Sequence, residues 1–205
     1  MQTMDLKALE KLSYGLFLLT VREGSRDNGC IINTAQQVTV EPDRVLLTVN
    51  RGSLTCEMLE RTGVFNLSVL STRAGFDIYR YFGMQSGRKI DKCAGREDLS
   101  RSANGLCFLT GGSACALISG VVEQSVEIDT HRLFVARVTE LRVLSEDEPA
   151  TYAFYHQTVK PAPAPSEKKG WRCKVCGYLY EGEALPAGYV CPLCGHGATD
   201  FEPVG

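Results

Sequence analysis

The chain has 205 residues, of which 44% are hydrophobic and 22% are charged, and its formal net charge is −2. This length allows one ordinary domain and a small second one, and the apolar content is sufficient for a packed core. Residues 1–157 carry 17 basic and 19 acidic side chains, and residues 171–205 carry 2 and 4. Neither part is basic, which argues against a nucleic-acid partner, and the early apolar run at residues 16–19 is too short for a signal peptide or a membrane span.

The apolar periodicity predicts many strands and few helices. Leucines at three-residue steps predict a short helix over residues 5–12, and a second helix is predicted over residues 53–62, where Ser53 can cap it. The predicted strands are residues 16–22, 30–36, 44–50 and 64–70, separated by turns such as 22–29 and 41–43, and then two long strands within 116–144. With no alternation of strands and helices, this pattern predicts a mainly β fold, an antiparallel barrel.

A change of composition marks the end of this barrel. Residues 158–170 alternate proline with alanine and then become charged, which is typical of an extended, semi-stiff spacer. We therefore expect a barrel domain over residues 1–157, a linker over 158–170, and a small domain over 171–205.

The small domain contains two Cys-x-x-Cys-Gly motifs, with cysteines at positions 173, 176, 191 and 194. Such a turn places both sulfurs on one side of the backbone, and its glycine allows the turn to close. Two facing turns form a tetrahedral all-sulfur site, which suits zinc or a single iron. A structural zinc ribbon needs nothing more, but a dense aromatic shell, which excludes water from a redox metal, favours iron. The shell residues are Trp171, Tyr178, Tyr180, Tyr189 and Phe201.

The other five cysteines show no spacing that suggests pairing. They are Cys30, Cys56, Cys93, Cys107 and Cys115. An odd number of cysteines scattered through apolar sequence is typical of reduced, buried thiols. We therefore expect a soluble, cytoplasmic protein.

The cysteine motifs lie in a setting that resembles rubredoxin. The similar stretches, over about 33 residues, are Trp171-Arg172-Cys173, Cys176-Gly177-Tyr178 and Cys191-Pro192-Leu193-Cys194-Gly195. The short segment between the two pairs is closer to the rubredoxin-like module of rubrerythrins. This resemblance implies one iron held by Cys173, Cys176, Cys191 and Cys194, with zinc as the alternative metal.

Three stretches of the barrel combine hydroxyl or amide side chains with glycine or a helix start. They are residues 28–39, 49–55 and 82–92. Hydroxyl groups, backbone N–H groups and the cations Arg51, Arg88 and Lys92 suit a phosphate or another anion. Each stretch alone is equally typical of an ordinary turn.

In this order, and with residues 129–138 and 152–155, the three stretches resemble the flavin reductase-like family and its FMN-binding split barrel. The resemblance implies bound FMN and a homodimer formed through this domain. It places Ile32, Asn33 and Thr34 at the flavin ring. It places Asn50, Arg51 and Thr55 at the phosphate and ribityl end of the cofactor, and a closing loop contributes Ser86, Gly87, Arg88 and Lys92. His131 matches a histidine near the nicotinamide, although a satisfied strand histidine is the alternative. His156 and His196 are expected at the surface.

The two modules together resemble the high-molecular-weight rubredoxin family. A flavin accepts a hydride, whereas a one-iron thiolate site passes single electrons. The resemblance implies electron flow from NADH or NADPH through FMN to the iron, and then to a protein acceptor, a flavodiiron nitric oxide or dioxygen reductase. Three alternatives remain: an NAD(P)H:flavin reductase with a structural zinc ribbon, an electron carrier reduced by another redox protein, and a non-enzymatic zinc-ribbon adaptor.

Overall fold

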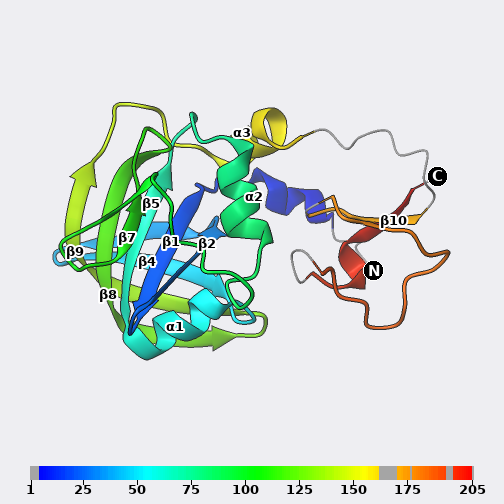
Figure 1. Cartoon of the computed structure of the whole chain (residues 1–205), viewed down its shortest axis with the longest axis horizontal. Helices are drawn as coiled ribbons and strands as arrows, with labels where there is room; N and C mark the ends of the chain where they lie inside the picture. The colour runs from blue at the N-terminus through cyan, green and yellow to red at the C-terminus, as the bar shows by residue number, and fades with distance from the viewer. Residues whose placement is uncertain (1–4, 162–169, 176, 193–195, 205) are drawn as a thin grey trace.

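The computed structural model describes residues 5–161, 170–175, 177–192 and 196–204. These residues form a large β structure and, beyond residue 170, a small unit beside it (Figure 1). The helices are η1 (Leu6–Lys11), α1 (Leu54–Thr62), α2 (Phe76–Met84), α3 (Tyr152–Phe154), η2 (Tyr155–Val159) and η3 (Ala198–Asp200). The strands are β1 (Phe17–Glu23), β2 (Arg26–Ile32), β3 (Ala35–Val40), β4 (Asp43–Asn50), β5 (Val64–Leu70), β6 (Leu99–Arg101), β7 (Cys107–Leu109), β8 (Ala114–Ile128), β9 (His131–Val143), β10 (Gly170–Cys173), β11 (Leu179–Tyr180) and β12 (Phe201–Val204).

Seven strands form one antiparallel sheet in the order β2-β1-β5-β8-β9-β4-β3. The edge strands β2 and β3 follow each other in the sequence, with only Asn33 and Thr34 between them. The sheet therefore curls until its edges meet at this corner, which makes it a split barrel. The predicted barrel is confirmed.

The predicted strand over residues 30–36 is wrong, because this segment contains the corner between β2 and β3. The predicted loop over residues 22–29 is also too long. Glu23 pairs with Arg26, so the turn needs only two residues, and Gly24 adopts the left-handed φ of 59° that such a turn requires. Strand pairing thus extends further than the polar sequence of this segment suggested.

Strand β1 is buried on both faces. Leu19 packs inside the barrel with residues such as Phe65, whereas its neighbour Leu18 packs outside against Ile78 and Phe82 of α2. Complete burial of one leucine side chain contributes about 1.5–3 kcal/mol. Helix α2 was not predicted, although Ile78 and Phe82 lie four residues apart, a spacing that places them on one helix face.

Helix α1 begins and ends as its sequence predicted. The Ser53 side chain accepts a hydrogen bond from the backbone N–H of Cys56 over 3.1 Å. At the other end Gly63 adopts a φ of 66°, and its N–H donates to the carbonyl of Leu59 over 2.8 Å. The two caps fix the helix directly after β4.

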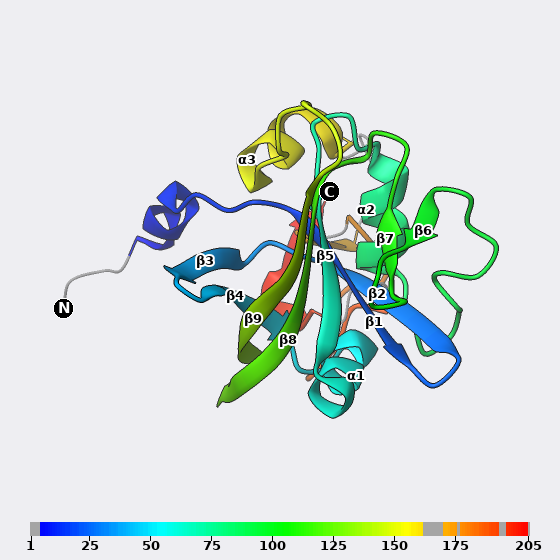
Figure 2. The same ribbon diagram turned by 90° about the vertical axis from the view of Figure 1, so that its left-hand side faces the viewer.

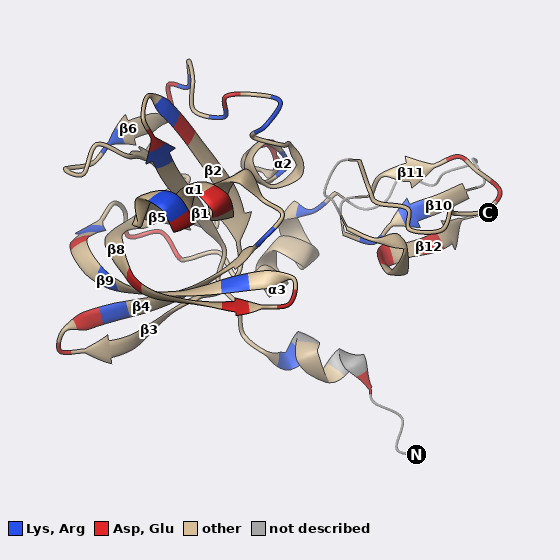
Figure 3. Ribbon diagram, turned by 90° about the horizontal axis from the view of Figure 1, so that it is seen from below, with Lys and Arg blue, Asp and Glu red and all other residues tan. Residues whose placement is uncertain are grey.

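Strands β8 and β9 form the predicted long hairpin. Its turn contains Asp129 at a φ of 42°, and the hairpin tip lies near α1 (Figure 2). Arg132 at the start of β9 bonds to Glu60 of α1. Acidic residues of β8 pair with basic residues of β4 and β9, and both kinds of charge appear on this part of the sheet (Figure 3). Arg44 and Glu123, for example, lie 2.7 Å apart.

The small unit is a three-stranded sheet in the order β11-β10-β12. Lys160 Nζ donates to the carbonyl oxygen of Lys174 over 3.0 Å and so connects the end of the barrel domain to this unit. Residues 162–169 of the predicted linker lie outside the described residues. Among the described helices, none has the length and apolar character needed to cross a membrane. The five barrel cysteines form no disulfide within the described chain.

Candidate functional site

A cavity of about 520 Å³ lies between the barrel and the small C-terminal unit. This volume is in the range of cofactor pockets. Strands β2 and β4, the start of α1, the end of α2 and the loop after α2 contribute to its wall. Six of the predicted cofactor-binding residues line it: Ile32, Asn50, Thr55, Ser86, Gly87 and Lys92. The structure thus brings three separate stretches of the sequence to one site.

Asn28 on β2 is a buried polar residue of this wall. Its Nδ2 donates to Thr55 Oγ1 over 2.9 Å, whereas its Oδ1 is buried and has no hydrogen-bond partner within the described residues. An unpaired buried oxygen costs about 1–3 kcal/mol. The cavity therefore favours a ligand that donates a hydrogen bond at this point.

Gly87 allows the loop after α2 to approach Asn28 closely. A Cβ atom at position 87 would lie 2.1 Å from Asn28 Oδ1, and the Asn28 side chain is fixed by Thr55. A larger residue would have to displace the asparagine. Glycine at this position keeps the cavity wall intact.

Lys92 places a cation in the wall. Its side chain is buried, and Nζ donates to the carbonyl oxygens of Gly29, over 3.0 Å, and Phe82, over 2.7 Å. Burial lowers the pKa of Lys92. An ammonium has three N–H donors, so one remains for a ligand in the cavity.

Four predicted cofactor-binding residues are not among those that line the cavity. Arg51 pairs with Glu127 over 2.7 Å and donates to the carbonyl of Asp129, and Arg88 pairs with Glu57. Asn33 and Thr34 form the corner between β2 and β3, where the Thr34 hydroxyl bonds to Asn33 Oδ1 over 3.2 Å. Their predicted roles remain predictions.

His131 lies outside the cavity wall as well. It is exposed at the start of β9, and its Nδ1 is 2.8 Å from the hydroxyl oxygen of Thr130. Its partner in the β4–β9 register is Asn50, which does line the cavity. His131 therefore lies at the same end of the barrel as the predicted flavin site.

Two of the four predicted metal ligands, Cys173 and Cys191, are buried in the small unit. The other two, Cys176 and Cys194, lie outside the described residues. Around Cys173 the backbone folds into a closed turn: its N–H donates to the Tyr178 carbonyl and its own carbonyl accepts from Gly177, each over 2.8 Å. Gly177 has a φ of 79°, the left-handed conformation expected for this motif.

The predicted aromatic shell is confirmed around these cysteines. All five predicted rings belong to the hydrophobic cluster that contains Cys173 and Cys191. The Tyr189 ring packs at a tilt of 52° against Tyr180, with 4.7 Å between ring centroids, and contacts Phe201 edge-on at 5.4 Å. A hydrogen bond with Tyr178 and burial raise the pKa of Tyr189 to about 12. Buried thiolates inside such a shell fit an iron or zinc ion from which water is excluded.

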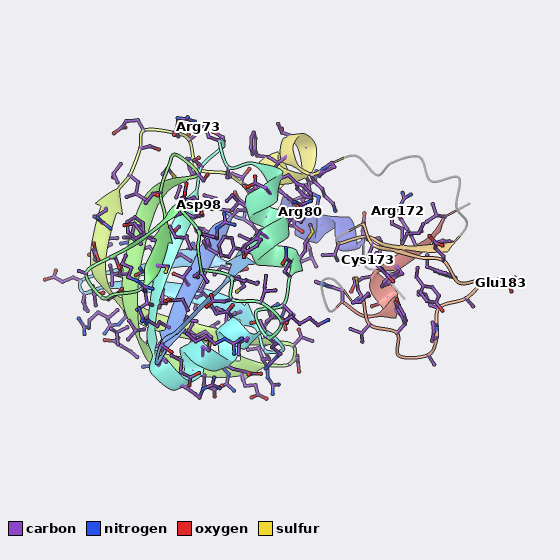
Figure 4. The ribbon with its side chains drawn as sticks, in the orientation of Figure 1. Arg73, Arg80, Asp98, Arg172, Cys173 and Glu183 are labelled. Atoms are coloured by element: carbon purple, nitrogen blue, oxygen red, sulfur yellow. The ribbon has the colours of Figure 1, made fainter. Side chains whose placement is uncertain are left out.

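The small unit also contributes to the flavin-type cavity. Cys191, Pro192 and His196 line it together with the barrel residues. In Figure 4, Cys173 lies toward the barrel, whereas Glu183 lies at the far end of the unit. The side of the unit that carries these cysteines is therefore the side next to the cavity.

The residues present fit a flavin. The wall offers an unpaired acceptor at Asn28, a cationic donor at Lys92 and apolar surface from Ile31, Ile32 and Phe82. A planar ring with polar edges and an anionic tail needs this combination. No role was predicted for Asn28. His156 is exposed as predicted, but His196, which was also predicted at the surface, is half-buried and lines the cavity. Asn28 lay within a highlighted stretch, but only its burial distinguishes it from an ordinary turn residue.

Residues 9–163 match the family model of the flavin reductase like domain, and residues 171–202 match that of the rubrerythrin, rubredoxin-like domain. High molecular weight rubredoxin of Moorella thermoacetica is 33% identical over 231 aligned residues, which cover 98% of this chain and 100% of that protein. The ferric-chelate reductase (NAD(P)H) of Archaeoglobus fulgidus is 31% identical over 153 residues, which cover 75% of this chain and 89% of that protein.

Solved structures show the same barrel. The FMN-binding protein of Thermus thermophilus superimposes with a TM-score of 0.61 and 20% identity, over 70% of this chain and 78% of that one. At this identity the similarity establishes the fold of the N-terminal domain and not its ligand.

Proposed function

Because the chain belongs to the high-molecular-weight rubredoxin family, with a flavin reductase-like and a rubredoxin-like domain, we propose that it is an FMN-containing oxidoreductase. It carries electrons from NADH or NADPH to a one-iron centre and then to a protein acceptor. The observation that carries this proposal is the cavity itself, whose wall contains both barrel residues and Cys191 of the iron module.

The residues of the cavity have separate tasks in this proposal. A bound flavin supplies hydride chemistry, and a four-cysteine iron supplies single-electron transfer. Lys92 and Asn28 bind and orient polar groups of the cofactor, because each has unused hydrogen-bonding capacity in the wall. Ile32 and Phe82 exclude water from the site.

The iron would be held by Cys173, Cys176, Cys191 and Cys194, with two of these sulfurs provided by residues outside the described chain. Trp171 and Tyr189 are part of the shell that keeps the site dry. The indole N–H of Trp171 donates to the carbonyl of Glu183 over 3.3 Å, which fixes the ring in this shell. We propose FMN as the flavin because hydroxyl groups and cations of the barrel suit one terminal phosphate, and the sequence contains no Gly-x-Gly-x-x-Gly fingerprint of a dinucleotide-binding Rossmann fold.

The acceptor in this proposal is a flavodiiron protein. Residues 171–205 carry 2 basic and 4 acidic side chains, and a thiolate iron site adds negative charge. A partner with a positive docking face is therefore favoured, and rim charges of this kind mainly raise the association rate. Transfer to a purified flavodiiron protein that slows as ionic strength increases is the expected result.

Rapid mixing of the oxidised, FMN- and iron-loaded chain with NADH tests the order of the centres. The flavin absorbance should bleach before, or together with, the ferric charge-transfer band. Iron that NADH reduces in a preparation without FMN would contradict this order. A chain that binds stoichiometric zinc after expression in iron-rich medium would instead support a flavin reductase with a structural zinc ribbon.

We also propose a homodimer that forms through the barrel. The hairpin of β8 and β9 exposes Val126 and Ile128, which are 54% and 46% accessible in the single chain. The two residues lie two positions apart on β8 and so share one face of the strand, and exposed apolar side chains on one face suit a partner surface. Sedimentation equilibrium should give twice the mass of one chain, and Val126→Glu should shift the equilibrium to the monomer.

A further inference from the structure

His196 belongs to both halves of the redox site. It follows the second cysteine pair of the iron module and lines the cavity together with Ser86 and Lys92 of the barrel. Its carbonyl oxygen accepts a hydrogen bond from the backbone N–H of Cys191 over 2.7 Å. The position of His196 is therefore coupled directly to that of Cys191.

The imidazole of His196 has an unused polar atom. Its Nδ1 is buried and has no hydrogen-bond partner in the part of the chain that the structure describes. The unpaired Oδ1 of Asn28 belongs to the same cavity, so each domain contributes one buried polar atom of this kind. Such atoms are destabilising unless a ligand or water bonds to them.

We propose that His196 is a positioning residue that forms a hydrogen bond with the flavin bound in the cavity and thereby holds Cys191 next to it. This inference rests on the proposed function, because it requires a flavin in the cavity. The edge of a flavin ring offers both N–H donors and oxygen or nitrogen acceptors. Either tautomer of the imidazole can therefore find a partner there.

The hydrogen bond from Lys160 to the Lys174 carbonyl also connects the two domains. It lies at the surface and holds a long side chain with many rotamers, so it contributes little to a fixed orientation. Cofactor binding and module orientation should therefore depend on each other through His196.

The first experiment uses the unmodified chain. The protein contains three histidines, so it can be labelled with ¹⁵N-histidine, loaded with zinc to remove paramagnetism, and titrated with FMN. The Nδ1 resonance of His196 should shift as FMN binds, whereas that of His156, which lies outside the cavity wall, should not. Bound FMN, seen by its fluorescence, with an unchanged His196 resonance overturns the inference.

The second experiment compares full-length variants. His196→Ala should weaken FMN binding about 2- to 10-fold, the factor for one net hydrogen bond, and should alter the flavin absorption spectrum. His196→Gln should restore most of the affinity, and His156→Ala should equal the wild type. If His196→Ala contains its full amount of iron and still shows the wild-type FMN affinity and flavin spectrum, the inference about His196 is wrong, whereas the proposed function is unaffected. A wild-type chain that binds no FMN contradicts the proposed function.

Discussion

The ammonium nitrogen of Lys92 lies 2.7 Å from the carbonyl oxygen of Phe82, the residue at which the last turn of α2 meets the cavity. This bond ties the loop after α2 to the helix and keeps a buried cation at the cavity wall. A lysine in this environment both supports the loop and binds an anionic group.

Replacement of this cation should weaken flavin binding. Lys92→Met removes the charge and leaves two backbone carbonyls without a donor, so we expect a loss of about 1–3 kcal/mol in FMN binding free energy. Fluorescence titration measures this loss. Lys89→Met is the matched control, because Lys89 also lines the cavity but is exposed. Equal affinities of the two variants would exclude a special role for Lys92.

Gly87→Ala should destabilise the chain even without a cofactor. The new Cβ would lie 2.1 Å from Asn28 Oδ1, and movement of Asn28 breaks its bond to Thr55. We expect about 1–3 kcal/mol lower free energy of unfolding. Gly83→Ala is the control, since its Cβ would lie 3.4 Å from Ile31, at the limit of ordinary contact. Urea denaturation of both variants should separate them, and equal midpoints would contradict the crowding at Gly87.

Removal of one sulfur ligand should separate the two redox functions. Cys176→Ser should abolish the ferric charge-transfer band, because a one-iron site of this type needs four thiolates. Its flavin should still bleach with NADH, but the variant should not reduce the acceptor protein. Cys115→Ser, at a buried position of β8 in the barrel domain, is the control and should keep both bands. A Cys176→Ser chain that still reduces the acceptor would show that electrons leave directly from the flavin.

The hydride donor and the iron module should compete for the cavity. Pro192 and His196 occupy part of its wall, so a nicotinamide that enters on this side requires the module to move away. A redox-inert tetrahydro analogue of NADH should therefore slow reduction of the iron by photoreduced flavin in the intact chain. Adenosine monophosphate, which lacks the nicotinamide, is the control. If a saturating concentration of the analogue left the rate of iron reduction unchanged, the nicotinamide and the iron module would lie on different sides of the cofactor.

Substitution of His131 tests the prediction that this residue lies near the nicotinamide of the hydride donor. His131 lies opposite Asn50 at the start of β9 and is exposed. We expect His131→Ala to lower the rate of flavin reduction by NADH and to leave FMN affinity unchanged, because the side chain does not line the cavity. The comparison with His156→Ala in stopped-flow measurements decides this point. Equal reduction rates would leave His131 as an ordinary strand residue.

Local patterns in the sequence were sufficient for several features of this protein. The cap of α1 at Ser53, the long hairpin of β8 and β9, and the aromatic shell around the cysteines were all predicted. Each depends on residues close together in the chain, whose spacing and chemistry already define the contact. The first cysteine motif is of the same kind, because the hydrogen bond from the Gly177 N–H to the Cys173 carbonyl closes its turn within five residues.

Contacts between distant segments decided the rest. Arg88 pairs with Glu57 and Arg51 pairs with Glu127 on β8, although both arginines were predicted to bind the cofactor. Neither ion pair follows from the local sequence. Asn28 became part of the site only because β2 is buried against α1, and His196 only because the iron module lies against the barrel. The free energy of such groups depends on burial and on partners far away in the chain, and these exist only once the sheet has closed and the two domains have come together.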